Sequence, residues 1–151
     1  MTRLTEAELR EVLATHEVIS DTGSVDMKRI HAGRETVPTE HEEQAALFAW
    51  ADSEGGDAAL LYANVNGQYR KGQRPEAGLR AGIPDVFLPV ARNGYHGLYI
   101  ELKRRKGGVL SEAQREWLRV LEGQGYAVGV SYGASQAIAT IKDYLFGGGD
   151  G

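Results

Sequence analysis

Two carboxylates and an ammonium group stand in the most strand-like part of this sequence. Asp85 opens the apolar run 84–90, while Glu101 and Lys103 interrupt the apolar run 97–103. Side chains two positions apart on a strand share a face, so Glu101 and Lys103 point the same way. Charged groups are costly in a buried strand unless they are paired or bind an ion, so these three residues are candidates for chemistry.

The two carboxylates can converge only if the hairpin between the two runs has a particular register. With a plain two-residue Asn-Gly loop, Asp85 would lie across from Leu102 and point to the wrong face. A loop or bulge that differs by one residue instead sets Asp85 opposite Glu101 or Lys103. We therefore predict a longer or bulged turn within residues 91–96.

Converging carboxylates and a lysine suit metal-assisted attack on a phosphodiester. Two nearby carboxylates repel each other unless a cation lies between them. Oxygen ligands, in a chain with no cysteine, favour Mg²⁺ or Mn²⁺, which bind phosphate oxygens readily. A lysine beside the ion can position a water or stabilise charge in the transition state. The alternative is that Glu101 and Lys103 form an edge-strand ion pair worth about 0–1 kcal/mol.

The elements around these residues indicate one α/β domain. Capping boxes, a hydroxyl residue followed three positions later by Glu or Gln, mark three helix starts: Thr5 with Glu8, Thr39 with Glu42, and Ser111 with Gln114. Expected strands are 59–65, 84–90, 97–103 and 126–132, and a closing helix is expected at 134–146. From residue 39 the order is helix, strand, strand, strand, helix, strand, helix, which predicts a mixed central sheet flanked by helices on both faces.

Three segments divide the chain by composition. Residues 1–37 are predicted to form an N-terminal helical arm or extension, residues 38–146 the domain, and residues 147–151 a disordered glycine-rich tail. The chain of 151 residues is 42% apolar and contains no cysteine, which excludes disulfide frameworks and thiolate zinc sites. It has neither an apolar run long enough for a membrane span nor a secretory signal pattern, so we expect a cytoplasmic protein.

Basic residues concentrate around the charged strands although the net charge is −4. Residues 66–119 contain 11 basic and 5 acidic side chains, whereas residues 1–65 contain 5 and 13. At physiological salt, screening limits the range of electrostatic interactions between exposed charges to about 8 Å. A local cluster of basic residues can therefore attract a polyanion even though the net charge of the chain is negative. The alternative is that these basic residues belong to an ordinary solvated loop and bind no polyanion. A long loop at 66–82 lies inside this basic segment, and such loops inside compact domains tend to be functional or disordered.

At this point the chain resembles a known family. Pro84-Asp85 followed by Glu101-Leu102-Lys103 is similar to the signature of the PD-(D/E)xK nuclease superfamily, and the surroundings resemble its VRR-NUC (virus-type replication-repair nuclease) branch. The matching pieces are EHEEQAALF (40–48), NG (66–67), AGIPDVFLPVARNGYHGLYIELK (81–103), GGVLSEAQREWL (107–118) and GY (125–126). The resemblance spans residues 39–146 and implies a restriction-endonuclease-like αβββαβα core that cleaves DNA with a divalent metal.

The resemblance also implies roles for the strand residues. Asp85, Glu101 and the main-chain carbonyl of Leu102 match the family's metal ligands, and Lys103 matches its catalytic lysine.

An acidic residue on the first core helix commonly completes the family's metal site, with a glutamine one turn later. Glu40 with Gln44 fits this position, and their spacing puts both on one helical face. Glu43 shares that face and is the alternative metal ligand on this helix, whereas the capping box accounts for Glu42. Gln114 could approach the site from the second core helix, although its capping role is the simpler account. Asn66, in the matching NG segment, is a possible supporting residue.

Basic residues on both sides of the site are expected to hold the DNA backbone without reading sequence. They are Arg70, Lys71, Arg74 and Arg80 in the long loop, and Arg104, Arg105 and Lys106 after the second charged strand. The resemblance implies a phage or bacterial enzyme of replication, recombination or repair. Stand-alone relatives resemble junction resolvases, so it also implies branched or flapped DNA as substrate and a homodimer. The alternatives are a sequence-specific restriction-type nuclease and a non-catalytic nucleic-acid-binding module on the same fold.

Overall fold

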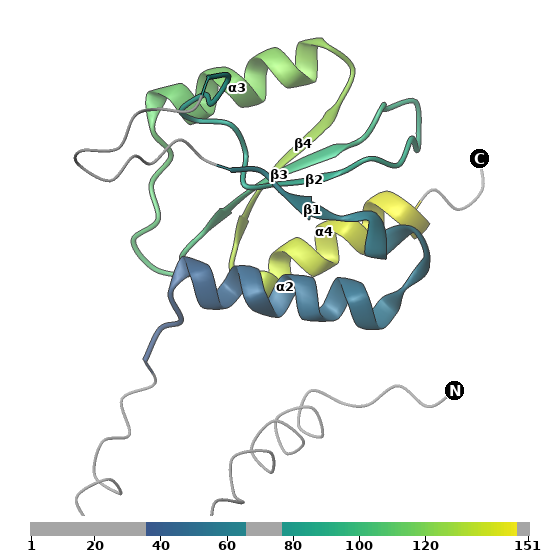
Figure 1. Ribbon diagram of the computed structural model, residues 1–151, viewed down its shortest axis with the longest axis horizontal. Coiled ribbons are helices and arrows are strands. Elements are labelled where there is room, and N and C mark those ends of the chain that lie inside the picture. Colours follow the sequence, from purple (N-terminus) through teal and green to yellow (C-terminus); the bar gives the residue numbers. More distant parts are fainter. Residues whose placement is uncertain (1–35, 66–76, 148–151) are drawn as a thin grey trace, which may run out of the picture. The chain divides into compact units, whose positions relative to one another are not determined.

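A four-stranded mixed sheet forms the centre of the computed structural model, which describes residues 36–65 and 77–147 (Figure 1). The strands are β1 (Tyr62–Ala63), β2 (Val86–Leu88), β3 (Leu98–Lys103) and β4 (Ala127–Tyr132), and they lie side by side in that order. β1 with β2 and β2 with β3 are antiparallel, while β3 with β4 is parallel. In the described ranges no helix has the length and apolar character needed to cross a membrane.

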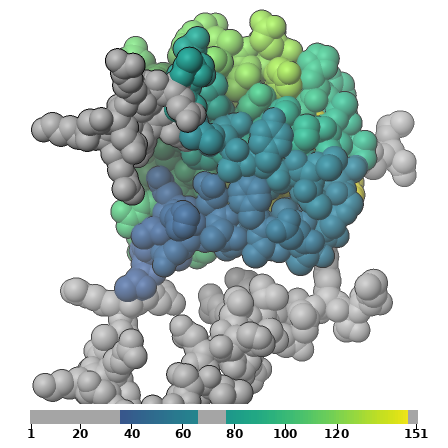
Figure 2. Space-filling model, viewed as in Figure 1, coloured from purple at the N-terminus to yellow at the C-terminus, as the bar shows by residue number. Residues whose placement is uncertain are grey.

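Three α-helices flank this sheet. They are α2 (Glu40–Glu54), α3 (Glu112–Gly123) and α4 (Ala134–Phe146). α2 and α4 lie together on one side of the sheet and α3 on the other, and α2 runs across the lower part of the surface in the space-filling view (Figures 1 and 2). The predicted αβββαβα order and the mixed sheet between helices are confirmed.

Two of the three predicted capping boxes are present. The Thr39 hydroxyl accepts a hydrogen bond from the Glu42 main-chain nitrogen, and the Glu42 carboxylate accepts one from the Thr39 main-chain nitrogen. Ser111 and Gln114 make the same reciprocal pair at the start of α3. The box predicted at Thr5 lies outside the described residues. These caps satisfy main-chain donors that a helix start otherwise leaves unpaired.

The strand predicted at 59–65 was largely wrong. Most of its first half belongs to a 3-10 helix, η1 (Gly56–Leu60), and β1 contains only two residues. Gly55 and Gly56 both have positive φ, so the chain turns sharply after α2 and coils once more before it extends. Leu60 is 51% exposed. The apolar run therefore contains the end of a short helical turn, the buried residue Leu61 and a two-residue exposed strand in place of one long buried strand.

The hydrophobic core lies on the side of the sheet that α2 and α4 cover. Leu47 of α2, Ile141 of α4 and Val86, Leu88 and Ile100 of the sheet are fully buried in one cluster. Alternate residues of β2 and β3 point to the opposite side, toward the layer of α3. This alternation separates an apolar face that stabilises the fold from a face that carries the charged residues.

The β2–β3 hairpin has the register that the two carboxylates require. Val86 pairs with Ile100 and Leu88 with Leu98, so the next pair along the ladder is Asp85 and Glu101. The turn itself is a plain two-residue loop, because Arg92 pairs with Tyr95 and both turn residues have positive φ.

The extra residue lies before that turn. Between the pair Leu88–Leu98 and the pair Arg92–Tyr95, one strand has three residues, 89–91, and the other has two, 96–97. The one-residue shift that the sequence required is present, but the prediction of a longer or bulged turn within 91–96 was wrong in position, because the extra residue lies in 89–91 and the turn itself is a plain two-residue loop. Pro89 has no N–H to offer a ladder, so this is where pairing slips by one residue.

Candidate active site

Asp85 and Glu101 meet at the end of the hairpin, on the side of the sheet that faces α3. Asp85 lies directly before β2, and its Oδ2 accepts a hydrogen bond of 2.7 Å from the main-chain nitrogen of Leu102. Glu101 is 1% exposed. The hydrogen bond ties the Asp85 side chain to β3, so the two carboxylates are held close together by the ladder and not by flexible loops.

The two oxygens of Glu101 have different surroundings. Oε1 lies 3.0 Å from Nζ of Lys103 and also accepts a hydrogen bond from Nε2 of Gln114. Oε2 is buried and has no hydrogen-bond partner among the described residues. A buried acceptor without a partner costs free energy of about 1–3 kcal/mol, and more when it is charged. A buried carboxylate oxygen without a partner, on a residue whose neighbour Asp85 is a second carboxylate, fits a bound cation.

Burial raises the pKa of Glu101 to about 7, with the charge of Asp85 as the second cause. The hydrogen bond and charge of Lys103 act in the opposite direction, and the charge of Glu40 adds a further small increase to this pKa. Without a metal, Glu101 therefore keeps its proton to a higher pH than an ordinary carboxyl group does. A divalent cation would remove the repulsion that favours this proton.

The ligand set fits a hard divalent ion that keeps several waters. Within residues 36–65 and 77–147, no three acidic or histidine side chains converge as a ready-made metal cluster. Two carboxylates supplemented by a main-chain oxygen and water match the habit of Mg²⁺ and Mn²⁺, which rarely use all-protein cages. The chemistry of the donors therefore agrees with the cation that the sequence predicts.

A comparison with protein families assigns this chain. The VRR-NUC domain profile matches residues 33–135, which is about two thirds of the sequence. The chain belongs to the VRR-NUC family. A solved structure described as a VRR_NUC domain protein is 26% identical, superposes with a TM-score of 0.63, and covers 73% of this chain and 90% of that chain. No curated protein matches the sequence. Membership makes this a nuclease domain of the PD-(D/E)xK type and confirms the resemblance seen in the sequence.

Within this VRR-NUC domain, α2 offers Glu40 to the site and uses Glu43 elsewhere. Glu40 is exposed at the first position of the helix, and its charge acts on Glu101. Glu43 is 2% exposed and is held by two other groups. Gln44, one turn after Glu40, is half-buried. Because Glu43 is held by other groups, Glu40 stays the expected helix ligand of the two alternatives left open by the sequence.

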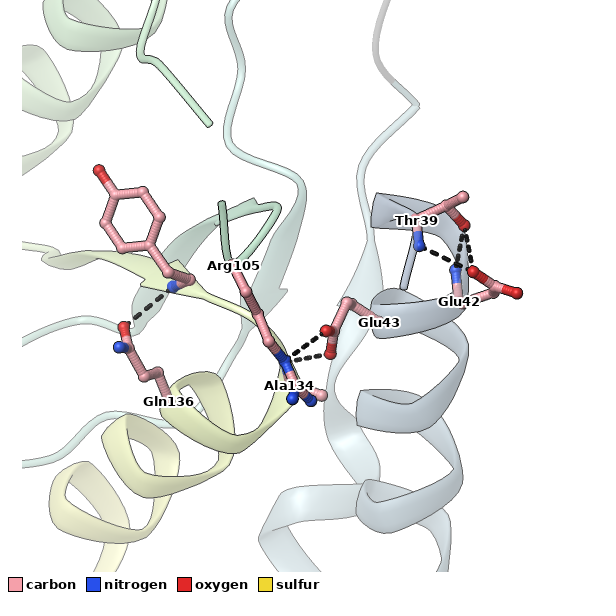
Figure 3. Close-up of polar contacts among 7 residues, drawn as sticks. Thr39, Glu42, Glu43, Arg105, Ala134 and Gln136 are labelled. Atoms are coloured by element: carbon pink, nitrogen blue, oxygen red, sulfur yellow. Dashed lines mark hydrogen bonds and ion pairs between the residues drawn. The ribbon is translucent and has the colours of Figure 1, made fainter. Parts of the chain in front are cut away.

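Glu43 connects three distant parts of the domain (Figure 3). Its Oε1 lies 2.7 Å from Nε of Arg105, directly after β3, and its Oε2 accepts a 2.8 Å hydrogen bond from the main-chain nitrogen of Ala134. Gly133, the N-cap residue of α4, makes no side-chain cap of its own, so Glu43 supplies that cap from α2. A side chain at Gly133 would collide with Arg105, since a Cβ there would lie 2.8 Å from its Nε.

Asn64 supports the site and was missed in the sequence. Its main-chain nitrogen donates to the carbonyl of Asp85, and its Nδ2 donates to the carbonyl of Pro84, each at 2.8 Å. The side-chain amide and the main-chain N–H of this one residue therefore hold two successive carbonyls, those of Pro84 and Asp85. The only available signal was its position at the end of an apolar run, which does not reveal a partner twenty residues away.

A second set of contacts fixes Gln114. Trp117 Nε1 donates to the carbonyl of Ala81 at 3.0 Å, and a Cβ on Gly82 would lie 2.7 Å from the main chain of Ala113. Gly82 also has a positive φ of 86°, so only glycine allows the chain to lie this close to α3. Gln114 consequently both caps α3 and reaches Glu101, so the two roles considered for it coexist.

The expected DNA-contacting residues divide into three groups. Arg70, Lys71 and Arg74, together with Asn66, lie outside the described residues. Arg80, Arg104 and Lys106 are exposed. Arg105 is half-exposed but its Nε is paired with Glu43, so part of this side chain stabilises the fold.

Proposed function

We propose that this VRR-NUC protein is a Mg²⁺- or Mn²⁺-dependent DNA endonuclease that hydrolyses phosphodiester bonds and acts preferentially on branched or flapped DNA. One observation carries the proposal. Glu101 is buried beside Asp85, and one of its oxygens is held by Lys103 and Gln114. Its other oxygen has no hydrogen-bond partner within residues 36–65 and 77–147. A cation bound between the two carboxylates would supply the partner that this buried oxygen lacks.

Asp85, Glu101, the carbonyl of Leu102 and Glu40 are the groups that would hold the cation. Bound there, a divalent ion supplies a Lewis acid for the phosphate and lowers the pKa of water. Gln114 and Lys103 hold Oε1 of Glu101, which leaves Oε2 directed for binding. The Asp85 carboxylate is oriented by the Leu102 main chain.

Lys103 would act on the reacting phosphate. Its ammonium lies 3.0 Å from Glu101 and its side chain is 10% exposed, so it is oriented and largely shielded from water. A cation in such a site stabilises negative charge that develops on the phosphate oxygens, because little reorganisation is needed during the reaction. It can also donate a hydrogen bond that orients the attacking water. In-line attack would leave 5′-phosphate and 3′-hydroxyl ends.

The exposed basic residues Arg80, Arg104 and Lys106 would contact neighbouring phosphates and contribute affinity without sequence preference. The predicted set of DNA-contacting residues also includes Arg70, Lys71 and Arg74. We further propose that two subunits act together on paired strands in a phage or bacterial system of replication, recombination or repair. We also propose that residues 1–37 form an arm and residues 38–146 the nuclease domain.

The proposal is tested by a cleavage assay on four-way junction, flap, splayed and linear DNA, each with and without Mg²⁺. We expect cleavage only with the metal and fastest on a branched substrate. Asp85→Asn should lower the rate by at least about a hundredfold, because it removes one of the carboxylate charges that would hold the cation. Cleavage of one linear sequence with no preference for branches would instead support a restriction-type enzyme. Absence of any metal binding or cleavage would support a non-catalytic binding module.

Metal binding should depend on pH through Glu101. Its pKa of about 7 means that a proton competes with the cation below neutrality. Affinity should therefore fall by up to about tenfold per pH unit below pH 7 and level off above it. Calorimetric titration with Mn²⁺ at pH 6 and pH 8, in buffers of different ionisation enthalpy, should show close to one proton released at pH 6 and almost none at pH 8. Equal proton release at both values would contradict this assignment.

A further inference from the structure

An aromatic cluster lies on the same side of the sheet as the carboxylates. The rings of Phe87 and Tyr99 are stacked with centroids 4.2 Å apart. Tyr62 meets Phe87 edge-to-face at 5.6 Å, and Tyr126 meets Tyr99 edge-to-face at 5.2 Å. Four rings from four neighbouring segments therefore form one continuous aromatic surface. None of them belongs to the hydrophobic core between the sheet and the helices α2 and α4.

The strand register places this cluster next to the active site. Tyr62, Phe87 and Tyr99 are cross-strand partners and form one row. Asn64, Asp85 and Glu101 form the parallel row two residues further along each strand, and the two rows share a face because side chains alternate with a period of two. Two residues of strand correspond to about 7 Å. The aromatic row thus lies about two nucleotide steps from the carboxylates, since stacked nucleotides rise about 3.4 Å each along one strand.

The cluster is only partly covered by protein among the described residues. Tyr62 is 48% exposed, and Phe87, Tyr99 and Tyr126 are half-buried, whereas Val86 and Ile100 on the opposite face are fully buried. Three of the four residues are tyrosines, whose hydroxyl groups allow a ring to lie partly in water. An incompletely covered aromatic surface beside a phosphate-cleaving site has the features of a platform for nucleobases.

We propose that the aromatic cluster of Tyr62, Phe87, Tyr99 and Tyr126 stacks unpaired nucleobases next to the bond that is cut. This inference rests on the proposed nuclease function and names the substrate class, DNA with unpaired nucleotides beside the scissile phosphate. Inside a duplex both faces of each base are covered by its neighbours, so a ring surface can accept only bases that are unpaired or splayed apart. The cluster would thereby select branched over continuous DNA without reading sequence.

The decisive variant is Tyr62→Leu, which removes the most exposed ring and keeps an apolar side chain. We expect kcat/KM for a substrate with unpaired nucleotides beside the cut to fall by on the order of tenfold, and kcat/KM for a fully paired substrate to stay unchanged. Tyr62→Phe should keep the wild-type preference, because the ring is retained. Tyr95→Leu is the matched control, since Tyr95 is 44% exposed in the hairpin turn and makes no ring contact with the cluster among the described residues.

Base-free nucleotides supply an independent test. Replacing the unpaired bases by abasic units should lower wild-type kcat/KM by a similar factor, and should lower that of Tyr62→Leu much less. An unchanged preference in Tyr62→Leu, or equal abasic effects in both proteins, would overturn the inference while leaving the nuclease function intact. A changed sedimentation coefficient in Tyr62→Leu without altered preference would show that the cluster is instead a contact between two copies of the chain.

The test does not depend on cleavage alone. Fluorescence anisotropy with a single-stranded oligonucleotide, with and without its bases, measures stacking even if no substrate is cut. Failure of the wild-type protein to cleave any DNA would count against the proposed function. Equal binding of the two oligonucleotides would count against stacking itself.

Discussion

Replacing Lys103 with methionine should lower the rate of DNA cleavage by about a thousandfold while leaving the domain folded. Removing one oriented group that stabilises transition-state charge typically costs a factor of about 10² to 10³. Lys103 also holds the Glu101 carboxylate, so its loss raises the pKa of Glu101 further and weakens metal binding. Methionine is chosen because its side chain, like that of lysine, is unbranched at Cβ. Gly108 lies so close that a Cβ added to Gly108 would be 2.8 Å from the Cβ of Lys103, so a branched side chain at position 103 would not fit.

Single-turnover cleavage at saturating Mg²⁺ would measure this effect apart from the loss of metal affinity. Lys106→Met is the matched control, because Lys106 is an exposed lysine three residues later and should affect DNA affinity and its salt dependence more than the chemical step. If Lys103→Met cleaved at more than a tenth of the wild-type rate under these conditions, Lys103 would not stabilise the transition state. The Glu101–Lys103 pair would then be only a structural ion pair.

Replacing Glu43 with alanine should have the largest effect on stability. The change removes a buried carboxylate that pairs with Arg105 and caps α4 through Ala134, so it breaks the connection between α2, the end of β3 and α4. We expect the free energy of unfolding to fall by about 2–4 kcal/mol, as is typical for loss of one partner in a buried charged network. Urea denaturation monitored by circular dichroism would measure it.

Two further variants make the Glu43 result interpretable. Arg105→Met should also destabilise the domain, because it leaves the buried Glu43 carboxylate without its cation. Glu116→Ala is the control, since it breaks an exposed ion pair with Arg119 and should leave the urea midpoint unchanged. A Glu43→Ala protein with wild-type stability but without metal binding would reverse the assignment and make Glu43, not Glu40, the helix residue of the metal site.

Local signals in the sequence predicted most of the elements. The capping boxes at Thr39 and Ser111 involve residues three positions apart, so the start of α2 and of α3 could be predicted from a short window. The alternation in 97–103 likewise placed Glu101 and Lys103 on one face. The same local reasoning failed at 59–65, because a short apolar run has no period that separates a strand from a helical turn.

Contacts between distant segments could not be predicted in this way. The need for a one-residue shift followed from the sequence, but its position at 89–91 depends on how the hairpin pairs beyond Pro89. Glu43 and Ala134 are 91 positions apart, and no pattern in either segment announces their hydrogen bond.

The sequence by itself determined which chemistry is available: two carboxylates and a lysine in two adjacent strands, flanked by basic residues. Only the tertiary structure decided how those groups are used. It paired one oxygen of Glu101 with Lys103 and Gln114 and left the other without a hydrogen-bond partner in the part of the chain that the structure describes. It also set a row of aromatic rings beside the carboxylates. The physical reason is that residue type and short spacing encode charge and local conformation, whereas burial and partners arise when the strands pair and the helices pack on them.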